Sequence, residues 1–142
     1  MKKLKYILGL ILIVIPGVYG YLAHQSMIPF YPLIAQIFFL VYWLWVGYVI
    51  GRFSKNSMKG MLLGNSVWVI SLVLFIWQFI LTDDVGRLGS VAAIPQYYIL
   101  PFVWLASKMA TLLTMIDGST IIILTFICML IVFVFGFRLG KR

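Results

Sequence analysis

Residues 47–64 read GYVIGRFSKNSMKGMLLG, and this stretch decides how the chain is organised. It contains the end of one apolar run, a short basic turn and the start of a second apolar run. A Gly-x-x-x-Gly pair flanks the turn on each side, at Gly47 and Gly51 and at Gly60 and Gly64. Glycines at this spacing let helix backbones approach closely, so the stretch predicts a helical hairpin in a membrane.

The composition extends this interpretation to the whole chain. Of its 142 residues, 64% are hydrophobic and 10% are charged, whereas soluble domains are about 45 to 50% apolar. A helix needs about 20 apolar residues to cross the hydrocarbon layer. We therefore predict an all-α polytopic membrane protein with a single membrane domain, and with four transmembrane helices near residues 6–23, 33–51, 61–81 and 119–137.

The first apolar run resembles a signal peptide, because three lysines precede it. Signal peptidase requires small residues before its cleavage site, and Tyr21 is bulky, so we expect an uncleaved helix. Pro16 interrupts this run and should free the carbonyl of Leu12 from helical hydrogen bonding. The single cysteine, Cys128, excludes an intrachain disulfide and any Cys-x-x-Cys site.

The positive charges predict the orientation. The net charge is +8, and with four spans most lysines and arginines fall on one side. Cytoplasmic segments retain positive charge, so both termini and the 52–60 turn should face the cytoplasm from the plasma membrane. We expect these clusters to attract anionic lipid only incidentally, and we predict no nucleic-acid partner. The residues concerned are Lys2, Lys3, Lys5, Arg52, Lys55, Lys59, Arg138, Lys141 and Arg142.

The segment from Thr82 to Gly118 is unusually long for so small a chain. It begins as a polar, glycine-rich loop and continues as an apolar stretch with Pro101 placed for a helix start. If this stretch crossed the membrane, the last span would run outward and its basic end would lie on the wrong side. We therefore predict an additional outer helix that lies in the interface or is re-entrant. Its narrow polar stripe comprises Ser107, Lys108, Thr111 and Thr114.

Polar and small residues inside the spans predict helix packing. In the second and third spans they fall on one stripe each, and matched heights predict a contact between the amides of Gln36 and Gln78. Packing is preferred to a pore lining, because two amides and a serine line an aqueous path thinly. A third pair, Gly136 and Gly140, is given little weight, since such spacing arises by chance in a glycine-rich chain. The predicted packing residues are Gln36, Gly47, Gly51, Gly60, Gly64, Ser71 and Gln78.

The sequence offers little for catalysis. Proton- or cation-coupled proteins usually hold an acid inside the membrane, but Asp83, Asp84 and Asp117 all lie at span ends. The single histidine, His24, has no partner at metal-ligand spacing. We therefore predict no catalytic, cofactor or metal site.

The leading functional hypothesis is a non-enzymatic membrane protein that acts through contact with another membrane protein or with further copies of itself, as an accessory, regulatory or immunity-type subunit. It depends on the apolar stretch from Pro95 to Ile116, which we expect to be too large for this small chain to cover. The alternatives are a small oligomeric transporter, flippase or pore component, and a membrane enzyme at the outer headgroup layer. The candidate outer surface for a partner or ligand comprises Asp83, Asp84, Arg87, Gln96, Tyr97, Trp104 and Lys108.

Overall fold

The computed structural model describes residues 2–29, 31–113 and 117–142. Within these ranges the chain is helical apart from turns and short loops, and it contains no β-strand. One element, η1, is a π-helix, and η2 is a single 3₁₀ turn. In chain order the elements are α1 (Lys2–His24), α2 (Pro32–Phe53), α3 (Ser57–Gly64), α4 (Ser66–Phe75), η1 (Ile76–Leu81), α5 (Gly89–Ile99), η2 (Leu100–Phe102), α6 (Val103–Leu112) and α7 (Gly118–Lys141).

The predicted fold class is confirmed, but the set of helices that could span the membrane differs from the predicted set in one helix. The span predicted at 61–81 is a bent pair of segments, Ser57–Gly64 and Ser66–Leu81, with 49° between them. The predicted outer helix is as long and apolar as a span. Among the described residues, four helices are long and apolar enough to cross a membrane: Ile7–His24, Pro32–Phe53, Gly89–Leu112 and Gly118–Lys141.

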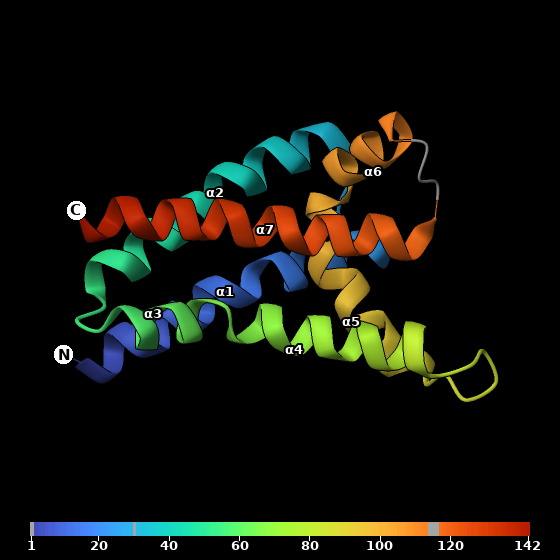
Figure 1. Cartoon of the computed structure of the whole chain (residues 1–142), viewed down its shortest axis with the longest axis horizontal. Coiled ribbons are helices and arrows are strands. Elements are labelled where there is room, and N and C mark those ends of the chain that lie inside the picture. The colour runs from blue at the N-terminus through green and yellow to red at the C-terminus, as the bar shows by residue number, and fades with distance from the viewer. Residues whose placement is uncertain (1, 30, 114–116) are drawn as a thin grey trace.

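Figure 1 shows how these segments are arranged. The helices α1, α2 and α7 and the bent pair lie along the long axis of the bundle, whereas α5, η2 and α6 run across it. The start of α1, the turn between α2 and α3, and the end of α7 lie at one end, which we call the basic end. The crossing segment, residues 89–112, is confined to the other half of the bundle, which we call the outer half.

The break in the third long segment comes from polar residues that bond their own helix. Asn56 caps the start of α3 by accepting hydrogen bonds from the amides of Met58 and Lys59. At the other end, the side-chain amide of Asn65 donates to the carbonyl of Met61, at 3.0 Å. Such local bonds compete with the regular helical pattern, so the helix breaks at Asn65 and restarts in a new direction.

A seam of four glycines joins α2 to α7. These two parallel helices share the longest contact of any pair of elements in the described chain. A Cβ atom added to Gly47 or Gly51 would overlap backbone atoms of α7, and one added to Gly136 or Gly140 would overlap those of α2. The Gly136 and Gly140 pair, which was expected to count for little, therefore forms half of this seam.

The other predicted glycine pair, on α3, also packs against α7. A Cβ atom at Gly64 would overlap the ring of Phe133, and one at Gly60 would overlap Ser54 and come within 2.9 Å of the ring of Phe137. The backbone carbonyls of the same two phenylalanines face the glycines of α2. The expectation that the pairs on α2 and α3 pack against each other is therefore wrong. Glycines permit close approach, but they do not specify which helix approaches.

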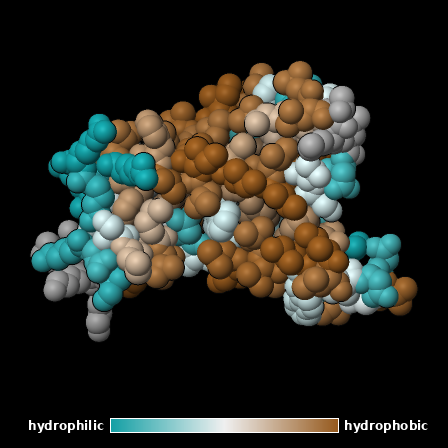
Figure 2. All heavy atoms as spheres, in the orientation of Figure 1, coloured by the Kyte–Doolittle hydropathy of each residue, from teal (hydrophilic) through white to brown (hydrophobic). Residues whose placement is uncertain are grey.

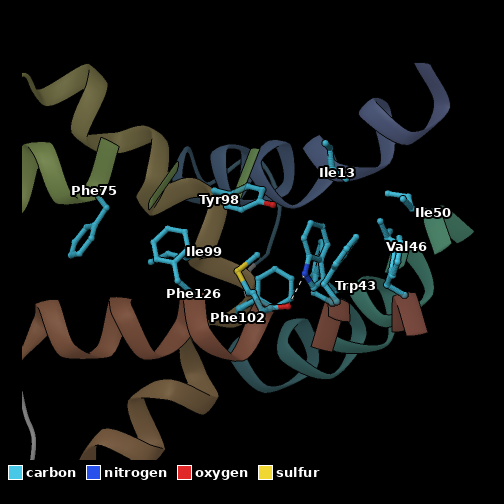
Figure 3. Close-up of a cluster of buried hydrophobic side chains, with 13 residues drawn as sticks. Ile13, Trp43, Val46, Ile50, Phe75, Tyr98, Ile99, Phe102 and Phe126 are labelled. Carbon is cyan, nitrogen blue, oxygen red and sulfur yellow. Dashed lines mark hydrogen bonds between the residues drawn. The ribbon is translucent and has the colours of Figure 1, made fainter. Parts of the chain in front are cut away.

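Aromatic side chains fill the middle of the bundle (Figure 3). Trp43 of α2 is fully buried, and its ring centroid lies 6.2 Å from that of Tyr98, 6.1 Å from that of Phe102 and 5.7 Å from that of Phe133. Its indole N–H donates to the main-chain carbonyl of Met129 at 3.0 Å. One side chain thus joins α2, the crossing segment and α7.

The carbonyl that the proline in α1 leaves without a helical donor is bonded by a side chain of α2. Because Pro16 has no N–H, the carbonyl of Leu12 lacks its helical donor. The hydroxyl of Tyr42 donates to that carbonyl at 2.8 Å. The carbonyl freed by the proline is therefore satisfied by a neighbouring helix, and the bond ties α1 to α2.

Candidate functional site

The crossing segment is inserted into the bundle rather than laid over it. It contacts α1, α2, α4 and α7, and one of its faces is buried along its whole length. The outer helix therefore dips into the protein, and the expectation that it is poorly covered does not hold for the described part of Pro95 to Ile116. Its buried residues are Ala92, Pro95, Tyr98, Ile99, Pro101, Phe102, Ala106 and Ala110.

Two buried glutamines hold this segment. Gln78 is fully buried in η1, and its side-chain oxygen accepts a hydrogen bond from the amide of Leu88 at 2.8 Å. Gln36 is 3% exposed in α2, and its side-chain oxygen accepts from the amide of Leu105 at 3.2 Å. The predicted contact between the two glutamines is therefore wrong, because Gln78 binds the amide of Leu88, just before the crossing segment, and Gln36 binds an amide within that segment.

Both bonds satisfy donors that a helix start leaves open. Leu88 immediately precedes α5, and Leu105 is the third residue of α6, where the helix resumes after η2. The first amides of a helix have no intrahelical acceptor, and a buried unpaired amide costs about 1–3 kcal/mol. The glutamine oxygens thus act as caps supplied by other helices, and they fix both parts of the crossing segment.

The loop that leads into α5 is folded back on η1 by Arg87. Its Nε donates to the main-chain carbonyl of Gln78 at 2.9 Å, and its guanidinium lies 4.6 Å from the ring centroid of Phe79. Its Nη2 is also paired with Asp84 at 2.9 Å. Because the carboxylate of Asp84 is 90% exposed, this ion pair contributes little. Arg87 is therefore a structural clamp for the loop.

The remaining predicted outer residues differ in their surroundings. Asp83 and Gln96 are exposed. The ring of Tyr97 lies 5.5 Å from Tyr21 and 5.1 Å from His24, so it closes the outer end of α1.

Lys108 belongs to a separate, exposed face of α6. Its ammonium lies 5.8 Å from the ring centroid of Trp104. On the same face, the hydroxyl of Thr111 donates to the carbonyl of Ser107 at 2.9 Å. The polar stripe predicted here is thus partly used within its own helix. Its last member, Thr114, lies outside the described residues.

All seven residues predicted to pack helices are buried, although their partners differ from those expected. Ser71 is 1% exposed in α4. In the described part of the chain, three buried polar atoms have no hydrogen-bond partner: Oδ1 of Asn65, Nε2 of Gln78 and the hydroxyl of Tyr98. Among the same residues, no group of three or more His, Cys, Asp or Glu side chains lies close enough to hold a metal ion.

An apolar groove lies between α1 and α2 in the outer half. The two helices are joined by a short loop but diverge, because α1 packs mainly on α5. The space left between them has a volume of about 500 Å³, and aromatic and branched side chains form its walls. Its lining residues are Ile15, Val18, Tyr19, Leu22, Tyr31, Ile34, Ala35, Phe38 and Phe39.

Sequence reasoning missed the side chains that bond α7. Trp68 of α4 donates its indole N–H to the carbonyl of Phe126 at 2.9 Å, as Trp43 does to Met129. Tryptophan is expected at membrane interfaces, but these two lie within apolar runs far from the run ends. Their position in the middle of apolar runs could have predicted these bonds, because a buried indole N–H needs a hydrogen-bond acceptor.

Comparison with known proteins adds no relationship: no family model matches the chain, and neither a curated protein nor a solved structure matches it significantly.

Proposed function

We propose that this chain is a non-enzymatic membrane protein that acts as an accessory subunit, by holding a transmembrane helix of a partner protein in the groove between α1 and α2. In this proposal the basic end faces the cytoplasm, because positive charge is retained there. The crossing segment then lies toward the outer surface of the plasma membrane.

The use of the polar side chains supports a role without chemistry. The side chains of Gln36, Gln78 and Tyr42 all bond the chain's own backbone, as do the indole groups of Trp43 and Trp68. A catalytic site requires groups that are free to meet a substrate in a defined geometry. Here the polar groups that are well positioned hold helices together.

The groove is the observation that carries the proposal. It is concave and apolar, and rings from both helices line it, among them Tyr19, Tyr31 and Phe38. Rigid aromatic side chains are enriched where proteins bind one another, and an apolar groove is the usual receptor for a helix. Within a membrane, close packing rather than water exclusion drives helix association, so a shaped recess favours a helix with complementary side chains. Ile34 and Phe38, which are 66% and 61% exposed, offer contact area.

Photocrosslinking in native membranes tests this proposal. A photoreactive residue at Phe38 should give a discrete protein adduct, whereas the same residue at Phe135, which is 59% exposed on α7, should give none. Filling the groove by Ala35→Phe should abolish the Phe38 adduct without unfolding the chain. Lipid adducts alone at Phe38, or equal protein adducts at both positions, would contradict the proposal. An adduct between two copies of the chain would identify the partner as a second copy.

The transporter alternative has one observation in its favour. The unpaired atoms of Asn65, Tyr98 and Gln78 are polar groups inside the bundle that a small polar solute could use. Solute flux in proteoliposomes that Tyr98→Phe abolishes, with the fold intact, would promote this alternative above the accessory role.

A further inference from the structure

The basic end contains a cleft that combines cationic walls with an apolar floor. It lies between α3 and α7 and has a volume of about 380 Å³. Three cationic side chains from the end of α7 line it, together with the hydroxyl of Ser57. The residues that line the cleft are Ser57, Met61, Val134, Phe137, Arg138, Lys141 and Arg142.

The positive charge around this cleft is not neutralised by the protein. The three acidic residues of the sequence, Asp83, Asp84 and Asp117, all lie near the opposite end of the long helices. In Figure 2 the larger group of hydrophilic side chains lies at the basic end and smaller groups lie at the opposite end, with a mostly hydrophobic surface between them. The cleft therefore has a positive charge that can attract an anion from outside the protein.

Lys141 is held in a fixed position at the edge of the cleft. Its ammonium donates to the main-chain carbonyls of Ser54 and Lys55, which follow the end of α2. An ammonium group has three donors, so one is left for a ligand. The side chains of Arg138 and Arg142 are exposed and add guanidinium groups that can bind phosphate oxygens in pairs.

The floor of the cleft determines what kind of anion fits. Met61, Val134 and Phe137 are apolar, and they lie where the apolar parts of α3 and α7 meet the basic turn. A soluble phosphate would gain nothing from this floor, whereas a phosphate that carries a hydrocarbon chain would cover it. Basic recesses between membrane helices are known to receive anionic lipid headgroups.

From these observations we propose that the cleft between α3 and α7 binds the phosphate of an anionic phospholipid, with Arg138, Lys141 and Arg142 as its ligands. This differs from general attraction to an anionic surface, because it assigns one lipid to one position. It is also independent of the groove between α1 and α2, which lies in the other half of the bundle.

Native mass spectrometry of the full chain in detergent micelles tests the proposal, with phosphatidylglycerol and phosphatidylcholine as probes. We expect one phosphatidylglycerol to be retained in preference to phosphatidylcholine. The double variant Arg138→Gln/Arg142→Gln should bind phosphatidylglycerol about tenfold more weakly or worse. The matched control Lys55→Gln/Lys59→Gln removes two charges at the same end but outside the cleft, and it should retain most of the binding.

Three results would overturn the proposal. Equal weakening in both double variants would show general attraction rather than a site. Displacement of the lipid by inorganic phosphate at the same concentration would show a site for soluble anions. Unchanged binding of phosphatidylglycerol in the variant Arg138→Gln/Arg142→Gln, with unchanged thermal unfolding, would show that these two guanidinium groups are not its ligands.

Discussion

The two halves of the bundle are held together by different interactions. In the basic half, α2 and α7 meet backbone to backbone across four glycines, and two phenylalanine rings rest on the glycines of α3. In the outer half, the crossing segment lies between the long helices, and glutamine side chains accept hydrogen bonds from an amide within it and from the amide of Leu88, which precedes it. Two backbones in direct contact cannot move apart to accept an added side chain without losing that contact. A segment held by separate side-chain hydrogen bonds can instead lose one bond while the others remain. The two halves should therefore respond differently to mutation.

The largest effect is expected in the glycine seam. Gly136→Val would force its side chain into the backbone of Leu44, and because neither backbone can yield, it should cost about 3 kcal/mol of unfolding free energy or more. Denaturant titration in mixed micelles measures this loss. Gly118→Ala is the matched control, because nothing lies within 4 Å of the added atom, and it should be near neutral. Similar losses at the two positions would contradict the seam.

A smaller effect is expected in the outer clasp. Gln78→Leu leaves the amide of Leu88 without its acceptor, which should cost about 1–2 kcal/mol. Hydrogen exchange should show faster exchange at Leu88, with α2 and α7 still protected at their seam. Gln96→Leu, an exposed position in α5, should change neither quantity. If exchange rises throughout the bundle, the two halves are not separable in the way we describe.

The bond between Tyr42 and Leu12 allows a sharper test. Tyr42→Phe should cost about 1 kcal/mol, because the carbonyl freed by Pro16 loses its donor. In a Pro16→Ala background, residue 16 supplies a helical N–H to that carbonyl, so Tyr42→Phe should then cost less. A double-mutant cycle measures the difference. Strict additivity would mean that the hydroxyl does not compensate for the proline.

The smallest effect is expected at the surface of the outer loop. Asp84→Asn removes the carboxylate paired with Arg87, and because that carboxylate is 90% exposed, the unfolding free energy should change by less than about 1 kcal/mol. Arg87→Met should cost more, since it also removes the bond to the carbonyl of Gln78. A larger loss in Asp84→Asn than in Arg87→Met would show that the ion pair, rather than the backbone bond, holds the loop.

Much of the architecture follows from local patterns. The apolar runs predict the membrane-length helices to within a few residues at α2 and at α7, and Pro16 predicts a carbonyl in need of a donor. Asp117 accepts a hydrogen bond from the amide of Thr120, as expected of an acid that precedes a helix. These features depend on residues close together in the chain, so the sequence is sufficient to identify them.

The candidate site was less accessible to sequence reasoning. The sequence predicts that Gln36 and Gln78 are buried polar residues, but it pairs them with each other because their helices are consecutive in the chain. The crossing segment lies inside the bundle between these two helices. Each glutamine side chain therefore accepts a hydrogen bond from a backbone amide in or next to that segment and does not reach the other glutamine. The break at Asn65 was also missed, since an asparagine inside an apolar run can face a partner, bond its own helix or end it.

The sequence by itself determined that the chain is all helical and that the runs at α1, α2 and α7 are long enough to cross a membrane, because length and hydropathy are properties of consecutive residues. Only the tertiary structure decided which helices touch. Gly47 and Gly60 carry the same signal of close approach, yet one receives the backbone of α7 and the other a serine and a phenylalanine ring. In a membrane, apolar helix faces differ little in their affinity for one another or for lipid, so the partner is chosen by shape and by a few hydrogen bonds. Both depend on residues that are far apart in the chain.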